Sequence, residues 1–366
     1  MNRLHKRSYA EADDLAIGRF EGRQHRESST QALLTRGETA TTDISPRYRV
    51  VIRYVEMNSD RFIPRRPLGR TGFPVTVLGI GDLADSAIPL EELVRTARRA
   101  LDAGLNVIDT APAYEEGLSE RVAGGAVAAH RRELVFLIDK IDHVDKPVHG
   151  QVEASLRNLG LDHTDAFVFH GVSDLSVWRQ LTAPGGMMDD LKACVREGKT
   201  RFTGVSSHHP DVVRDAILGG CCDLVMFPVG PFVDVRYLDL LPLAKEKGVG
   251  TVCFKTFGAG KLLGDTEGYQ RPLSSRPRGK LSSGGQDIAT PTLPCLTVQE
   301  CLHYTLTQDP DVALLGMSFP NEQDAAFAAA RSLLTLTAAQ IADIRARAAV
   351  AIQGKGNIWW NPSQDS

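Results

Sequence analysis

The regular alternation of short apolar segments with helix-like segments most constrains the fold of this chain. About eight short apolar runs occur between residues 76 and 317, and each precedes a stretch whose apolar residues recur with the period of a helix. Strands that are apolar on both faces and joined by helical crossovers form parallel sheets. Eight such units over roughly 250–300 residues fit a closed (β/α)8 TIM barrel. The expected strands are 76–81, 105–109, 134–139, 164–169, 200–206, 223–229, 250–255 and 311–317. The expected helices are 90–103, 119–129, 148–159, 187–197, 210–218, 236–247, 297–308, 321–332 and 337–352.

An open, doubly wound sheet that binds a dinucleotide is the alternative architecture, because it is built from the same units. That fold carries G-x-G-x-x-G after its first strand and an acidic residue about 20 residues later. Here Gly79-Ile-Gly81 lacks the third glycine and the acidic partner, so the pattern favours the barrel. Before the barrel, segment 63–77 predicts two short strands around a turn at 69–72, which is a β-hairpin.

The N-terminal residues differ in composition from the rest of the chain. Residues 1–60 are polar, mixed in charge and without a steady period, so we expect a disordered extension. Alternatively, the natural start is Met57. We assign residues 61–354 to the barrel and residues 355–366 to a C-terminal tail.

Charge and cysteine content argue against several classes of protein. The formal net charge of −3 provides no strong field to attract nucleic acid or a membrane surface. No apolar run reaches the about 20 residues that a membrane helix needs. The six cysteines form no CxxC pair, which predicts reduced thiols in a cytoplasmic protein. No His, Asp and Glu set has metal-site spacing, so we expect no metal and no metal-dependent hydrolase.

Four polar residues form the main candidate site. Asp109, Lys140 and His170 end three consecutive expected strands, and Tyr114 follows the first of them. Strand ends converge at the C-terminal face of a barrel, so the four side chains should meet there. Asp109 would orient Lys140, Lys140 would lower the pKa of Tyr114, and His170 would donate a hydrogen bond to a substrate oxygen. Each residue alone has a structural explanation, such as a helix cap. Together they predict protonation of a carbonyl oxygen, with hydride from a nicotinamide.

Several longer segments form a recognisable family pattern. They are PLGRTGFPVTVLGIG (67–81), ALDAGLNVIDTAPAY (100–114), GLSERVAGGAV (117–127), SLRNLGLDHTDAFVFH (155–170), VREGKTRFTGVSS (195–207), LPLAKEKGVG (241–250) and GMSFPNEQ (316–323). With these segments the chain resembles the aldo/keto reductase family from about Arg66 to its last helices. The resemblance implies a (β/α)8 barrel whose N-terminal hairpin closes the bottom, an NAD(P)H cofactor, and the family's catalytic residues at Asp109, Tyr114, Lys140 and His170. Tyr114 would then be the general acid in reduction and the base in oxidation.

The residues expected at the nicotinamide depart from the usual family pattern. Ser206 and Ser207 stand where a Ser-Asn pair is usual, and Met226 stands where a Gln is common. Phe254, next to Lys255, is the aromatic expected to stack on the nicotinamide ring.

The expected phosphate-binding residues also differ. Gly316 and Glu322 align with positions where NADP-preferring members carry Lys and Arg. NADP is the family default, but a carboxylate at Glu322 would repel a 2′-phosphate and favours NAD. Ser318 and the start of helix 321–332 could bind a phosphate through main-chain N–H groups.

The resemblance implies a small carbonyl or alcohol substrate, such as an aldehyde, a ketone or a sugar-like molecule. Loop 265–294 either folds over the cofactor or is an ordinary surface insertion. Trp359 and Trp360 either line the substrate pocket, hold the tail against the barrel or lie in a subunit contact. The spacing of Cys295 and Cys301 does not fit the iron–sulfur module of some relatives. A nucleotide-responsive regulatory subunit on the same fold is the alternative function, and the oligomeric state is left open.

Overall fold

A computed structural model describes residues 61–263, 294–353, 358, 360 and 361. The expected N-terminal extension, nearly all of loop 265–294, Trp359 and most of the expected tail therefore lie outside the described residues.

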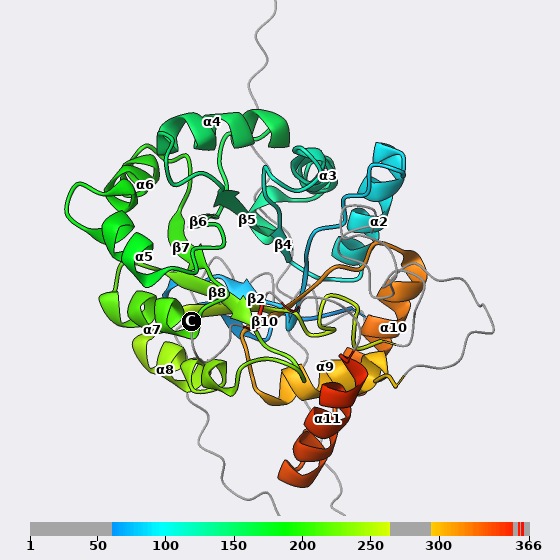
Figure 1. Cartoon of the computed structure of the whole chain (residues 1–366). Helices are drawn as coiled ribbons and strands as arrows, with labels where there is room; N and C mark the ends of the chain where they lie inside the picture. The colour runs from blue at the N-terminus through cyan, green and yellow to red at the C-terminus, as the bar shows by residue number, and fades with distance from the viewer. Residues whose placement is uncertain (1–60, 264–293, 354–357, 359, 362–366) are drawn as a thin grey trace, which may run out of the picture. The chain divides into compact units, whose positions relative to one another are not determined.

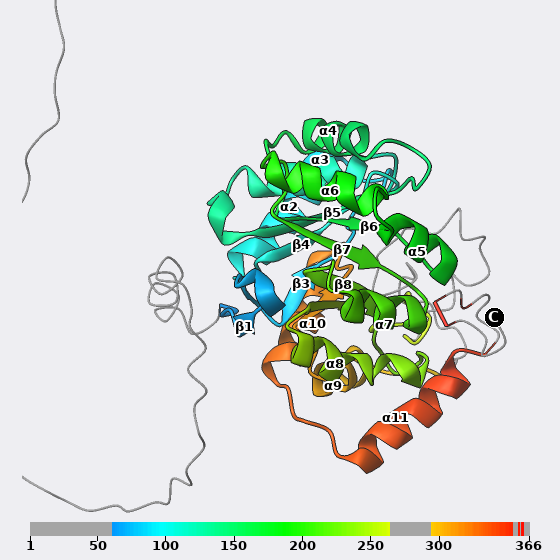
Figure 2. The ribbon, with the colours of Figure 1, turned by 90° about the vertical axis from the view of Figure 1, so that its left-hand side faces the viewer.

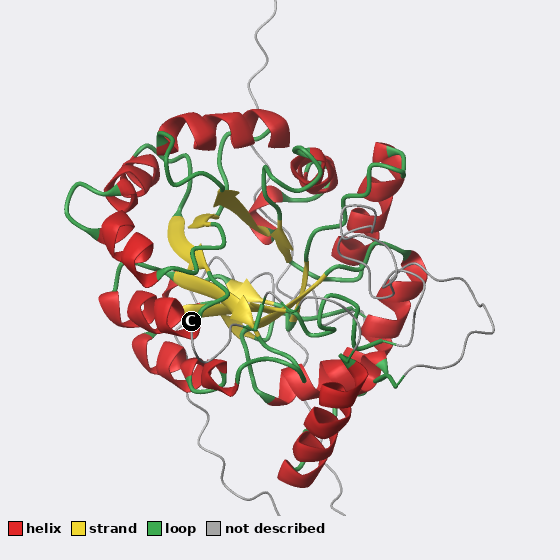
Figure 3. Cartoon of the chain, viewed as in Figure 1, coloured by secondary structure: helices red, strands yellow, loops and turns green. Residues whose placement is uncertain are grey.

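The described part of the chain contains a closed barrel of parallel strands in the order β10-β3-β4-β5-β6-β7-β8-β9. Figure 1 shows the helices as a ring around these strands, and Figure 3 shows the same view with yellow strands inside red helices. The predicted (β/α)8 barrel is confirmed, and the open doubly wound sheet is not the fold. The barrel strands are β3 (Leu78–Ile80), β4 (Val107–Asp109), β5 (Phe136–Ile141), β6 (Ala166–Phe169), β7 (Phe202–Ser206), β8 (Leu224–Pro228), β9 (Gly250–Phe254) and β10 (Val312–Leu315).

The helices follow the strands in chain order. Helix α5, between β6 and α6, was not predicted from the sequence. Asp174 is its N-cap residue, and the Asp174 side chain accepts from the N–H groups of Ser176 and Val177. Segment 236–247, expected as one helix, is divided into η3 and α8. The helices are α2 (Leu90–Asp102), α3 (Leu118–Val127), η2 (Arg132–Leu134), α4 (Val148–Leu159), α5 (Leu175–Thr182), α6 (Met187–Arg196), α7 (Pro210–Gly219), η3 (Val235–Tyr237), α8 (Leu240–Lys247), α9 (Val298–Thr307), α10 (Pro320–Arg331) and α11 (Ala338–Ala351).

Successive side chains along each strand point alternately into the barrel and out towards the helices, so the apolar residues form one cluster inside the barrel and one outside it. Inward-facing residues such as Val107, Ile138 and Val168 fill the barrel interior. Their neighbours Ile108 and Leu137 pack outward against the helices. Each strand is buried on both faces, which explains why its sequence is continuously apolar.

The predicted N-terminal hairpin consists of β1 (Arg66–Pro67), β2 (Pro74–Val75) and an intervening short helix, η1 (Gly69–Thr71). Leu68 and Phe73 pack with the interior cluster, and the Arg70 N–H donates to the carbonyl of Gly248, just before β9. The hairpin therefore covers the N-terminal ends of the barrel strands (Figure 2). Gly69 has a φ of 46°, and a Cβ there would lie 2.2 Å from the nitrogen of Gly250, so this close approach requires glycine.

No helix within the described ranges combines the length and the apolar character needed to cross a membrane.

Candidate active site

Strand alternation aims the candidate side chains into the C-terminal mouth of the barrel. Asp109 lies two residues after the inward-facing Val107, and Lys140 lies two residues after the inward-facing Ile138. His170 directly follows the last residue of β6. Because the three strands are consecutive neighbours in the barrel, these side chains converge on one region.

Lys140 and Asp109 form a buried ion pair. The Lys140 Nζ donates to the Oδ1 of Asp109 at 2.7 Å and to the carbonyl of Thr110 at 2.7 Å. The exposed fractions of Lys140 and Asp109 are 1% and 4%. Burial works to lower the pKa of Lys140, but the charge of Asp109 outweighs it and raises that pKa above its ordinary value. Lys140 is therefore a permanent ammonium with a fixed position.

Tyr114 lies against this ammonium. Its ring centroid is 4.6 Å from the Lys140 Nζ, and its hydroxyl is 3.3 Å from Nε2 of His170. The loop reaches this position through a sharp turn in which Glu115 and Glu116 have φ values of 47° and 53°. The structure thus brings Asp109, Tyr114, Lys140 and His170 together, each within contact of at least one other.

The pKa of Tyr114 differs from the sequence-based prediction. Burial raises the pKa of the Tyr114 phenol to about 12, and although Lys140 acts to lower it, Asp109 and Asp82 add to the increase. The predicted effect of Lys140 is present, but removal of the phenol from water has the larger effect, so the pKa of Tyr114 lies above its ordinary value.

Asp142 is a member of the site that the sequence did not identify. One of its oxygens binds Nδ1 of His170, and the other accepts the main-chain N–H of Ala113 at 2.6 Å. Burial works against ionisation of Asp142, but His170 holds its pKa below the ordinary value. An ionised carboxylate only accepts, so Nδ1 carries the hydrogen of this bond, and Nε2 faces the Tyr114 hydroxyl. Donation by His170 to a substrate oxygen stays a prediction.

Asp82 is a second acidic residue that the sequence did not identify. It follows β3, and one of its carboxylate oxygens accepts the N–H of Ala84 at 3.0 Å. Burial raises the pKa of Asp82 to about 6, although Ala84, Ser119 and Lys140 act to lower it. Strand alternation gave no signal for Asp82, because Ile80, two residues earlier, packs in the outer cluster.

The predicted nicotinamide residues on β7 and β8 are largely engaged with the protein itself. Ser206 ends β7 opposite Met226 of β8, and Met226 packs in the interior cluster. The Ser207 hydroxyl accepts the N–H of His209 at 3.0 Å and donates to its carbonyl at 3.3 Å. The Ser207 side chain therefore closes the turn before α7.

Phe254 and Lys255 lie at the end of β9, beside the C-terminal tail. The Phe254 ring centroid is 5.3 Å from that of His208, and the Lys255 ammonium is 5.7 Å from the Phe254 ring centroid. Lys255 is also 5.8 Å from the ring centroid of Trp360, whose Nε1 donates to the carbonyl of Phe232 at 3.1 Å. Trp360 is fully buried, which agrees with the interpretation that it holds the tail against the barrel.

Gly316, Ser318 and Glu322 lie between β10 and the first turn of α10. Glu322 is 5% exposed, and its Oε2 accepts the N–H of Phe319 at 3.2 Å. The carboxylate therefore caps the helix, a role that the sequence comparison alone did not reveal.

The sequence profile of the aldo/keto reductase family matches residues 76–348. This match covers the barrel strands and most of the described helices. The chain belongs to the aldo/keto reductase family. Its barrel therefore has a common origin with the other members of this family.

Two relatives of known activity illustrate the range of this family. The chain is 28% identical over 292 residues to L-galactose dehydrogenase of Arabidopsis thaliana, a match that covers 75% of this chain and 90% of that protein. It is 25% identical over 226 residues to the NADH-specific methylglyoxal reductase of Escherichia coli K12, which covers 54% of this chain and 68% of that protein.

Solved aldo/keto reductases share the fold. A Bacillus halodurans enzyme in its holo form aligns with a TM-score of 0.57 and 23% identity over 80% of this chain and 99% of that one. A Klebsiella pneumoniae enzyme in complex with NADPH aligns with a TM-score of 0.58 and 20% identity over 83% of this chain and 98% of that one.

The mouth of this aldo/keto reductase barrel contains groups that fit a nicotinamide dinucleotide. His208 Nε2 and Ser318 Oγ are buried and have no hydrogen-bond partner in the part of the chain that the structure describes. Burial lowers the pKa of His208 to about 3, with smaller effects from Lys255 and His170, so its ring is neutral and offers one donor and one acceptor. Ser318 precedes the N-terminus of α10, where main-chain N–H groups favour an anion.

Proposed function

We propose that this aldo/keto reductase interconverts a carbonyl and an alcohol with NAD(P)H as the hydride donor. The observation that carries the proposal is the series of contacts Asp109–Lys140–Tyr114–His170 at the barrel mouth, in which the ion pair is buried and the other two side chains are half-buried. A fixed ammonium against a phenol, with an imidazole at the phenol oxygen, is a proton-transfer site. Among the described residues, no group of three or more His, Cys, Asp and Glu side chains could hold a metal ion, so this proposal uses none.

Tyr114 is the proposed general acid. A substrate carbonyl oxygen placed beside its hydroxyl would receive the phenolic proton as negative charge develops on that oxygen. An alkoxide is a stronger base than a phenolate even when the phenol has a pKa of about 12, so the transfer is downhill. The Lys140 ammonium, held by Asp109, would stabilise the phenolate that results. In oxidation the same phenolate would remove the alcohol proton.

His208, Phe254 and Ser318 are the residues that would hold the cofactor. Phe254 presents an aromatic ring, the neutral His208 ring can bind a carboxamide, and Ser318 with the start of α10 can bind a phosphate. The bound nicotinamide supplies the hydride. Glu322 lies in the same first turn of α10, and its carboxylate supports a preference for NAD over NADP.

Substrates of the proposed reaction are small aldehydes, ketones or sugar-like molecules. The relatives named above act on a sugar and on a small dicarbonyl, as their names state, and both reactions need one proton-transfer site next to a nicotinamide.

The test is the variant Tyr114→Phe, assayed against a panel of aldehydes, ketones and sugars with both NADH and NADPH. We expect turnover to fall by about 10²- to 10⁴-fold, because the acid is lost. Cofactor binding, measured by quenching of tryptophan fluorescence, should remain. Tyr237→Phe is the matched control, since its buried hydroxyl has no hydrogen-bond partner in the described structure and it lies in the outer cluster.

The same assay distinguishes the proposed enzyme from the alternative function. A nucleotide-responsive regulatory subunit would bind the cofactor but show negligible turnover before any substitution. Equal turnover by the wild-type protein and Tyr114→Phe would refute the proposed role of the phenol.

A further inference from the structure

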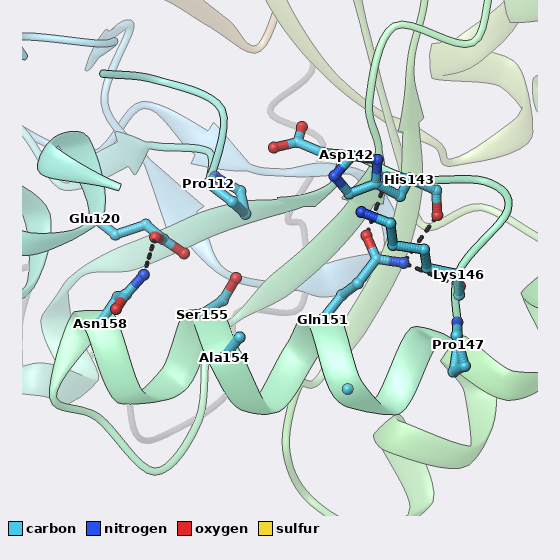
Figure 4. A pocket seen from close by; sticks show the side chains of 11 residues that line it. Pro112, Glu120, Asp142, His143, Lys146, Pro147, Gln151, Ala154, Ser155 and Asn158 are labelled. Carbon is cyan, nitrogen blue, oxygen red and sulfur yellow. Dashed lines mark hydrogen bonds between the residues drawn. The ribbon is translucent and has the colours of Figure 1, made fainter. Parts of the chain in front are cut away.

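A second cavity lies behind the catalytic loops, against helix α4. Its volume is about 400 Å³, within the range of small-molecule sites. One face of α4 forms its floor, Pro112 and Asp142 lie above, and Glu120 closes one end (Figure 4). We call it the α4 cavity.

The α4 cavity exists because α4 presents small side chains on this face. Gly150, Ala154 and Ser155 recur at helical spacing and line the cavity. A Cβ built on Gly150 would meet nothing within 4 Å, so the space beside it is open. Pro112 and Pro147 provide apolar walls around this floor.

Glu120 and Ser155 bring unsatisfied polar atoms to the α4 cavity. Both residues are at most 1% exposed, and both line the cavity. Glu120 Oε2 accepts from Asn158 at 2.8 Å, but Glu120 Oε1 and Ser155 Oγ have no hydrogen-bond partner in the part of the chain described. Figure 4 shows the Glu120 carboxylate and the Ser155 hydroxyl directed towards one another above α4. Buried polar atoms without partners indicate a site that a ligand completes.

A second acidic residue, Asp139, interacts with Glu120 from outside the lining of the cavity. Asp139 faces outward from β5, and its Oδ2 is also buried without a partner in the described ranges. Burial raises the pKa of Asp139, and the charge of Glu120 raises it further. Burial likewise raises the pKa of Glu120. Such a pair of carboxyl groups favours a shared proton, and a cation bound beside them would take the place of that proton.

Hydrogen bonds within the protein hold the loop that borders the mouth of the cavity. The Gln151 side chain donates to the carbonyls of His143 at 2.8 Å and Lys146 at 3.1 Å, and it accepts the N–H of His143 at 3.0 Å. These bonds fix the loop after β5 over the first turns of α4. The cavity is therefore preformed, which reduces the entropy lost when a ligand binds.

We propose that the α4 cavity binds a small primary alkylammonium ion. Its ammonium group would donate to Glu120 Oε1 and Ser155 Oγ, and its alkyl chain would lie between Pro112, Pro147 and Ala154. An ammonium supplies the donors that both oxygens lack and compensates the charge of the ionised Glu120 carboxylate, whereas an alcohol offers one donor and no charge. Lys146 also lines the cavity, but it is exposed to solvent at the opposite end, where its charge is screened.

The experiment is titration of the full-length protein with n-butylamine at pH 7, followed by calorimetry and by ligand-observed NMR. The amine is cationic at this pH, since its pKa is close to that of a lysine side chain, about 10.4. We expect saturable binding with a dissociation constant in the range of about 0.1–10 mM, as befits a ligand of so few atoms. n-Butanol, which has a hydroxyl in place of the ammonium, should not bind measurably.

Two variants test the site in different ways. Glu120→Gln changes the carboxyl group to an amide with little change of shape, and Gly150→Leu places a bulky side chain in the cavity at a position where a Cβ meets no atom within 4 Å. Each should weaken butylamine binding by at least about tenfold. Glu153→Gln on the exposed part of α4 is the control, and it should leave the affinity unchanged.

Three outcomes would overturn the proposal. They are equal binding of butanol and butylamine, undiminished binding in folded Gly150→Leu, and an equal loss of affinity in Glu153→Gln. If Glu120→Gln does not fold, Gly150→Leu still decides the question. All of these measurements report binding, so they are independent of whether Tyr114 transfers a proton.

Discussion

Asp142 binds the Nδ1 side of His170 and leaves Nε2 facing the hydroxyl of Tyr114. The same carboxylate accepts the N–H of Ala113, one residue before Tyr114. One acidic side chain therefore sets both the orientation of the imidazole and the position of the loop that carries the phenol.

We expect Asp142→Ala to lower kcat by about 10- to 100-fold, with a smaller change in KM, because His170 loses the partner that fixes its tautomer. The pH profile of kcat should shift as well, since the charge facing the imidazole is gone. Asp145→Ala in the exposed part of the same loop is the control. Unchanged pH dependence in Asp142→Ala would show that the contact is only structural.

Variants of the Lys140–Asp109 pair distinguish the contribution of Lys140 to stability from its contribution to turnover. Lys140→Met should lower the free energy of unfolding by about 3–5 kcal/mol, since it leaves the Asp109 carboxylate buried without its counter-ion. The double variant Lys140→Met with Asp109→Asn should regain most of the lost free energy of unfolding, as measured by urea denaturation. Turnover should stay abolished in both, because neither contains the ammonium. A stable, fully active Lys140→Met would contradict the proposed role.

Asp82 should make stability depend on pH between about 4 and 6. Its folded-state pKa of about 6 lies above the ordinary value of 3.8, so the folded protein holds a proton that the unfolded chain has released. Stability from this group is therefore lost as the pH rises through that window. Asp82→Asn, which can still accept from Ala84, should raise the free energy of unfolding at pH 7 by about 1–2 kcal/mol. Denaturation curves of both proteins at pH 4, 5, 6 and 7 should converge at the acidic end.

Glu322→Gln should change cofactor preference without loss of the helix cap. Glutamine can still accept the N–H of Phe319, whereas Glu322→Arg cannot and should destabilise the protein by about 1 kcal/mol. Removal of the negative charge should raise the ratio of kcat/KM for NADPH over NADH by about fivefold, equivalent to roughly 1 kcal/mol. If both cofactors respond equally, Glu322 lies away from the 2′ position of the ribose.

The barrel and the meeting of Asp109, Lys140 and His170 could be predicted because both follow from strand periodicity. An apolar strand buried on two faces predicts a parallel sheet, and two-residue alternation then decides which side chains face inward. Asp142 could not be assigned in this way, because it belongs to a loop whose direction depends on contacts with Ala113 and His170. Lys140 lowers the pKa of Tyr114 as predicted, but the larger, opposite effect of desolvation could not be predicted, since it is a property of the packed site and not of the order of residues. Glu322 was recognised by alignment, but its capping bond appears only in three dimensions.

The hairpin at the N-terminal ends of the strands determines how reactants reach the site. Leu68 and Phe73 pack into the interior cluster at that end, whereas the candidate catalytic residues lie at the opposite rim. Under the proposed function, cofactor and substrate would both enter across that rim. Whichever lies deeper must arrive first and depart last, so the shape of the barrel favours a compulsory order of binding and release.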